Sequence, residues 1–193
     1  MRPTEEKAAL IVAQEEAFAH TLALQVLDRP QLSIWMILIP IIFVYFFYRY
    51  QKFSSGRKVF CENYLISRKR ALNEALEVIR TGRKPEINAL ARQSSLPEHL
   101  REKNADVLAV LVDHYIDLLR ADGENFHALV RSAYRNQTNF LLFINRLNQA
   151  EKALNRALEP HLSQDSGDVN DIIHLINLHS EKIRKELSKK IFA

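Results

Sequence analysis

The sequence predicts an all-α protein made of a single transmembrane helix, a helical stalk and a small cytoplasmic helical bundle. Three observations support this fold class. Glycine and proline are scarce, with four and six among 193 residues, whereas sheet-rich folds need many tight-turn signals. Residues 30–48 contain no charged residue. Most of the other segments repeat their apolar residues at helical spacing.

Residues 1–29 are predicted to form an amphipathic N-terminal helix. Its apolar residues share one stripe of the helix surface: Ile11, Phe18, Leu22 and Val26. Glu15 and Glu16 interrupt the apolar sequence, so this helix is a poor membrane span. We expect it to lie at the membrane interface or to pack on a partner helix, and it lacks the basic polar face typical of lipid-binding helices. A protein partner is favoured.

Residues 30–48 are predicted to be the transmembrane helix. Nineteen residues reach about 28 Å as a helix, which nearly matches a hydrocarbon core of about 30 Å. Between positions 32 and 48, eleven residues are Leu, Ile, Val or Phe, and their insertion is favourable by about 5 kcal/mol in total. The stretch therefore inserts without help from other segments.

The aromatic residues of this stretch agree with a membrane span. Trp35 lies towards one end, and Tyr45 and Tyr48 lie at the other, where such rings prefer the headgroup level. Pro40 removes one backbone donor and kinks a helix. A proline at this depth also suits a re-entrant hairpin that bends at Pro40, so that alternative and a buried soluble core stay open.

The distribution of charge predicts the orientation. Residues 1–31 contain three Lys or Arg and five Asp or Glu, whereas residues 49–70 contain seven Lys or Arg and one Glu. Residues 71–193 contain 17 of each sign. The positive-inside rule then places the amino terminus outside and everything after residue 49 in the cytoplasm, at a plasma (inner) membrane. Four basic residues are expected to face anionic headgroups: Arg49, Lys52, Arg57 and Lys58.

The same distribution argues against nucleic-acid binding. A nucleic-acid-binding domain needs a basic face on the folded part of the chain. Here the excess positive charge lies beside the apolar segment, and the net charge of residues 71–193 is zero.

Residues 49–84 read as a basic juxtamembrane stalk helix that ends at Thr81-Gly82, because glycine suits the position after a helix. Residues 85–193 read as a helical bundle. The predicted bundle helices cover residues 85–93, about 98–120, about 124–159 and 169 to the carboxyl end. The single cysteine, Cys61, excludes an intrachain disulfide and a cysteine-rich zinc site.

Two short motifs are weak candidates for metal binding. Glu124 and His127, and again Asp171 and His174, have the Glu-x-x-His type of spacing found in di-metal helical bundles. Both acids are predicted to lie in a first helical turn, where an acid simply favours the helix dipole. We therefore predict no metal and no cofactor, and we expect His114 and His179 to be hydrogen-bonded core or seam residues.

The function predicted from sequence is that of a single-pass membrane-anchored scaffold, adaptor or accessory subunit. Its cytoplasmic bundle would bind a protein partner, while its basic stalk would contact membrane lipid. No motif specifies a catalytic nucleophile, so an enzyme is not expected. A membrane-tethered metal-dependent enzyme and a membrane-remodelling protein remain alternatives, and a homo-oligomer is left open.

Overall fold

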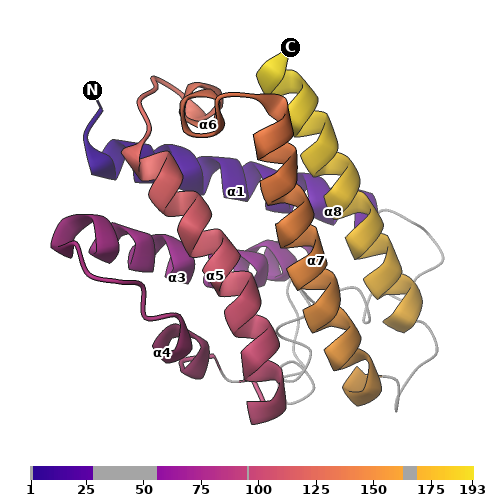
Figure 1. Cartoon of the computed structure of the whole chain (residues 1–193). Helices are drawn as coiled ribbons and strands as arrows, with labels where there is room; N and C mark the ends of the chain where they lie inside the picture. The colour runs from indigo at the N-terminus through magenta and orange to yellow at the C-terminus, as the bar shows by residue number, and fades with distance from the viewer. Residues whose placement is uncertain (1, 28–55, 95, 163–168) are drawn as a thin grey trace.

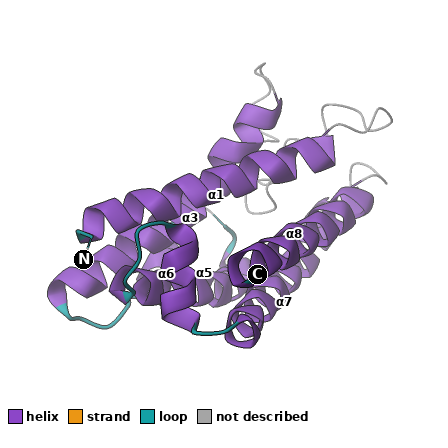
Figure 2. Ribbon diagram, turned by 90° about the horizontal axis from the view of Figure 1, so that it is seen from above, coloured by secondary structure: helices purple, strands orange, loops and turns teal. Residues whose placement is uncertain are grey.

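The computed structural model describes residues 2–27, 56–94, 96–162 and 169–193. Within these ranges every regular element is a helix: α1 (Thr4–Leu27), α3 (Gly56–Thr81), α4 (Ile87–Arg92), α5 (Glu98–Arg120), α6 (Phe126–Tyr134), α7 (Gln137–Leu162) and α8 (Val169–Phe192). The all-helical prediction is confirmed. In Figure 1, α5, α7 and α8 run side by side while α1 and α3 cross them. Seen from above in Figure 2, α1 lies beside α8.

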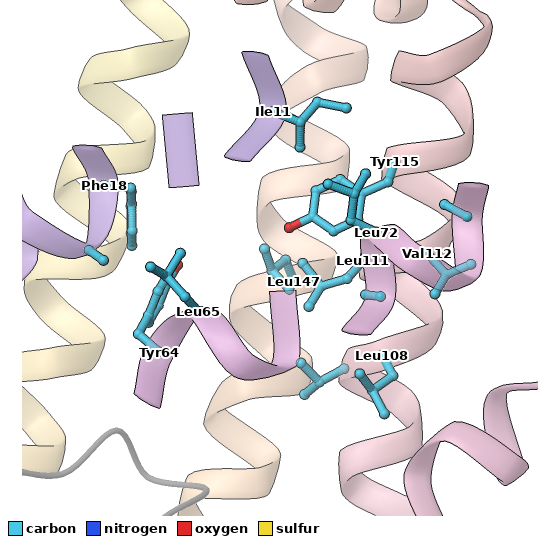
Figure 3. Packing of buried hydrophobic residues seen from close by; sticks show 14 of the residues in the cluster. Ile11, Phe18, Tyr64, Leu65, Leu72, Leu108, Leu111, Val112, Tyr115 and Leu147 are labelled. Carbon is cyan, nitrogen blue, oxygen red and sulfur yellow. The ribbon is translucent and has the colours of Figure 1, made fainter. Parts of the chain in front are cut away.

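One hydrophobic core joins these helices. Figure 3 shows side chains of α1, α3, α5 and α7 meeting in it, with Tyr115 of α5 near the centre. The stripe predicted on α1 is buried in this core: Ile11, Phe18, Leu22 and Val26. That stripe therefore packs on helices of its own chain, rather than on a bilayer surface or a separate partner. Burial of apolar area at about 25 cal/mol per Å² is the main force holding α1 in place.

The predicted fold class needs one correction. Among the described helices, none combines the length and the apolar character needed to cross a membrane. The transmembrane helix was predicted for residues 30–48, which lie outside the described residues. The described residues form a set of helices that share one core, and no transmembrane helix is found among them.

A second finding contradicts the single-pass arrangement directly, because α1 and α3 pack against each other as an antiparallel pair. The rings of Phe18 and Tyr64 stack with their centroids 5.5 Å apart. Glu15 Oε2 lies 3.8 Å from Arg68 Nε, and Glu16 lies 3.5 Å from Lys69. A lower residue number in α1 is thus paired with a higher residue number in α3, so the two helices run in opposite directions. A span between the two helices would place them on opposite sides of a membrane, where these contacts could not form.

Helix α3 ends where the sequence predicts. Gly82 adopts a left-handed φ of 71°, and its backbone N–H donates to the carbonyl of Val78 at 2.9 Å. Residues with a Cβ avoid this conformation, which explains the glycine. The helices predicted over residues 85–93 and about 98–120 correspond to α4 and α5.

The prediction of a single helix over residues 124–159 is wrong, because a turn between α6 and α7 interrupts the helix. Arg135 has a φ of 66°, and the N–H of Asn136 donates to the carbonyl of Tyr134 at 2.8 Å. This is the hydrogen bond of a γ-turn. The side chain of Asn136 then accepts from the N–H of Asn139 and caps α7.

Candidate functional site

The strongest concentration of buried charge lies where α1, α3, α7 and α8 meet. Its members are Glu15 from α1, Arg68 from α3, Asn148 and Glu151 from α7, and Arg184 from α8. We call these five residues the ionic joint. Both arginines are only 6% exposed, and a buried charge needs partners of opposite sign and satisfied hydrogen bonds.

Glu151 binds both arginines. Arg184 donates from its two terminal nitrogens to the two Glu151 oxygens at 2.6 and 2.9 Å. Arg68 donates to Glu151 Oε1 as well. Such two-pronged pairs are stronger than single hydrogen bonds because the guanidinium fork matches the carboxylate. The carboxylate therefore ties α3 and α8 to α7.

Aromatic rings support the two guanidinium groups. The Arg68 guanidinium lies 3.8 Å from the centroid of the Tyr64 ring, and the Arg184 guanidinium lies 5.1 Å from that of Phe18. Cations favour the face of an aromatic ring, more so away from water. Because Phe18 also stacks on Tyr64, the rings and charges form one connected group.

Glu15 links this group to α5. The Tyr115 hydroxyl donates to Glu15 Oε1 at 2.8 Å. The other Glu15 oxygen lies 3.8 Å from Arg68 Nε, which is an ion pair beyond hydrogen-bond range. Two arginines and two glutamates make the joint electrically neutral.

The charges at the joint hold one another ionised. Burial alone would raise the pKa of Glu151, but the charges of Arg184 and Arg68 outweigh it and lower that pKa. Burial likewise disfavours the charge of Arg184, yet Glu151 outweighs it and raises the arginine's pKa. A carboxylate held ionised and fully paired is a poor proton acceptor. The arrangement is therefore suited to fixing the register of four helices.

Two cavities of about 50 Å³ flank the joint, and the linings of both include Tyr64 and Arg68. One extends between Leu22, Phe60 and Ile176, and the other extends towards His114 and the phenylalanines of α7. Cavities of this size hold a few water molecules, whereas a cavity that binds benzene measures about 150 Å³. Small polar species fit here without movement of the helices.

His114 lies beside the second cavity and is buried. Its Nδ1 is 2.7 Å from the Tyr134 hydroxyl, and its ring stacks on Phe143 with a centroid distance of 3.9 Å. Burial, with a smaller effect from the charge of Arg184, lowers the pKa of His114 to about 3. The prediction of a hydrogen-bonded core histidine is confirmed for His114.

The structure keeps the two predicted metal motifs apart. Glu124 precedes Asn125, the N-cap of α6, so Glu124 and His127 do not share a helical face. Helix α6 contacts the far end of α8, where Arg131 donates to the carbonyl of Ile191. His174 is exposed. It lies 17 residues before Ile191 in α8, which is roughly 25 Å along the helix axis. Within the described ranges, no three His, Cys, Asp or Glu side chains could hold a metal ion together. The side chain of Asp171 is not among those described.

Trp35, Pro40, Tyr45, Tyr48, Arg49 and Lys52 lie outside the described residues, as does the side chain of Arg57. Lys58 is exposed in the first turn of α3, and its Nζ lies 3.9 Å from Glu62.

Comparisons with protein-family models, with curated proteins and with solved structures found no match for this chain.

The ionic joint was not predicted as a site. In the sequence, Glu151 is a polar residue that interrupts the apolar spacing of Ile144, Leu147, Leu154 and Leu158. Arg68 looked like one more basic residue after the apolar segment, and only its contact with Glu151, 83 residues away, reveals its role.

Proposed function

We propose that this protein is a helical scaffold or accessory subunit that attaches to one face of a membrane and binds a protein partner there. The observation that carries the proposal is the antiparallel packing of α1 on α3. These two helices flank the charge-free stretch at residues 30–48.

The composition of that stretch supports membrane attachment. Its Leu, Ile, Val and Phe residues favour insertion by about 5 kcal/mol. Because α1 ends at Leu27 and α3 begins at Gly56 within one antiparallel pair, the two residues that bound the segment containing this stretch lie at the same end of the pair. Attachment from one side satisfies both facts.

The fold supports the scaffold part of the proposal. Helix α7 presents the most exposed large hydrophobic side chain in the described part of the chain, Leu142, at 58%. The buried charges of the ionic joint are already paired with one another, so they favour a structural role over acid–base chemistry. The apolar stripe of α1 is buried in the core, which disfavours membrane remodelling by a free amphipathic α1.

Vesicle flotation tests the membrane part of the proposal. The full chain is expected to float with lipid vesicles, and the Ile39→Asp/Phe43→Asp variant is expected to stay with the soluble fraction. Equal flotation of the two proteins would contradict the assignment of residues 30–48. Affinity purification in detergent tests the scaffold part, where Leu142→Asp is expected to lose a partner that the unaltered chain retains.

A further inference from the structure

Exposed leucines lie on α1 and α8. Among the described side chains, the large hydrophobic residues that are exposed are Leu24 at 38%, Leu142 at 58% and Leu178 at 52%. Leu24 and Leu178 belong to α1 and α8, which pack together. Single exposed leucines are common on soluble surfaces, whereas neighbouring ones indicate a contact surface.

The contacts between α1 and α8 indicate how the two leucines are oriented. His179 Nδ1 lies 2.8 Å from Gln25 Oε1, and the Arg184 guanidinium lies 5.1 Å from the centroid of the Phe18 ring. The two helices are therefore antiparallel. In an antiparallel pair, the residues that immediately precede two facing residues project to the same side. Leu24 precedes Gln25 and Leu178 precedes His179, so both leucines point to one side of the pair.

This surface adjoins the end of the antiparallel α1–α3 pair at which α1 ends and α3 begins. Leu24 lies three residues before the end of α1, and α3, which pairs with α1 in the antiparallel sense, begins at Gly56. In Figure 1 the carboxyl end of α1 and the first turns of α8 lie on the same side of the molecule. Lys182 is exposed one turn after Leu178, and Lys58 is exposed in the first turn of α3. Cations beside apolar side chains suit an anionic bilayer surface.

We propose that Leu24 and Leu178 dock on the bilayer, with Lys58 and Lys182 facing its anionic headgroups. This inference rests on the proposed one-sided attachment and adds the orientation of the body. The long axis of the α1–α8 contact then lies close to the lipid surface, while Leu142 of α7 stays away from it.

Leu142 provides a matched control for the test. The full chain, Leu24→Ser/Leu178→Ser and Leu142→Ser are compared for binding to vesicles of phosphatidylcholine containing phosphatidylserine. All three should give the same circular-dichroism spectrum, because the altered side chains are exposed. Binding of the double variant is expected to weaken about tenfold, and that of the control to change less than about twofold. Equal binding by the two variants would overturn the docking surface while leaving the attachment intact. A full chain that does not bind vesicles at all would overturn both.

A second measurement locates the contact without relying on affinity. A polarity-sensitive fluorophore is attached to Leu178→Cys or Leu142→Cys in a Cys61→Ser background. Vesicles should shift the emission at position 178 to shorter wavelength and leave position 142 unchanged. A shift at position 142 alone would overturn the orientation. A shift at position 178 that appears with rising protein concentration and without lipid would identify a second copy of the chain as the occupant and also overturn the proposal.

Discussion

The rings of Phe18 and Tyr64 stack with their centroids 5.5 Å apart. In the sequence, residues 28–55, which include the charge-free stretch, separate the helices that carry these two rings. The contact brings α1 and α3 into one core with α5, α7 and α8. Whatever residues 30–48 contact, the helices before and after them belong to the same body.

Glu151 is predicted to be the residue on which the stability of the ionic joint depends. Glu151→Leu leaves Arg68 and Arg184 buried without their shared carboxylate, so the free energy of unfolding should fall by about 3 to 5 kcal/mol. Urea denaturation followed by circular dichroism measures this loss.

Replacing Arg68, Glu151 and Arg184 together with apolar residues distinguishes the effect of charge pairing on stability from the effect of side-chain packing. The variant Arg68→Met/Glu151→Leu/Arg184→Met removes both buried arginines together with Glu151 and leaves Glu15 with its hydrogen bond from Tyr115. It should be more stable than Glu151→Leu alone. A triple variant as unstable as the single one would show that packing at these positions matters more than charge pairing.

Lys7 is predicted to stabilise the junction between α1 and α5. It is only 2% exposed, and its Nζ donates to the carbonyl of Leu119 in the last turn of α5 at 3.1 Å. Lys7→Met leaves that carbonyl without its donor and should cost about 1 to 3 kcal/mol in thermal or urea unfolding. Lys69→Met is the control, because Lys69 forms an exposed pair with Glu16 worth less than about 1 kcal/mol. Equal losses would contradict a capping role for Lys7.

The pH dependence of stability should include a contribution from His114. Its pKa is about 3 in the folded protein and 6.5 as an ordinary histidine, so the unfolded chain binds a proton in this window that the folded chain does not. Stability from His114 is therefore complete above pH 6.5 and falls by up to about 1.4 kcal/mol per unit as the pH decreases towards 3.

The variant His114→Phe/Tyr134→Phe removes the histidine together with its hydrogen-bond partner. Urea unfolding at several pH values should give a shallower slope for this variant between pH 6 and 4 than for the unaltered chain. Parallel slopes would show that His114 is not the group responsible.

Regular apolar spacing made several helices predictable, whereas their pairing was not. The stripe of Ile11, Phe18 and Leu22 identified the buried face of α1, but spacing alone does not say what covers it. The strong hydropathy of residues 30–48 favoured a span, and a span separates α1 from α3. The pairing depends on tertiary contacts such as Glu15 with Arg68, which local pattern does not encode.

The break between α6 and α7 was missed for a different reason. Arg135 adopts a positive φ, which arginine rarely does and which no sequence pattern signals. Asn136 was the one available clue, because asparagine is a favoured helix cap. The ionic joint escaped prediction since its members come from four helices and meet only after folding.

The location of α1 relative to α8 in intact cells tests the account most directly. In a Cys61→Ser background, single cysteines are placed at the exposed positions Ala13 of α1 and Lys190 of α8 and treated with a maleimide that cannot cross membranes, before and after lysis. One-sided attachment predicts that both cysteines are labelled or both are protected in intact cells. Labelling of the α1 cysteine with protection of the α8 cysteine would contradict the account and place a membrane between the two helices.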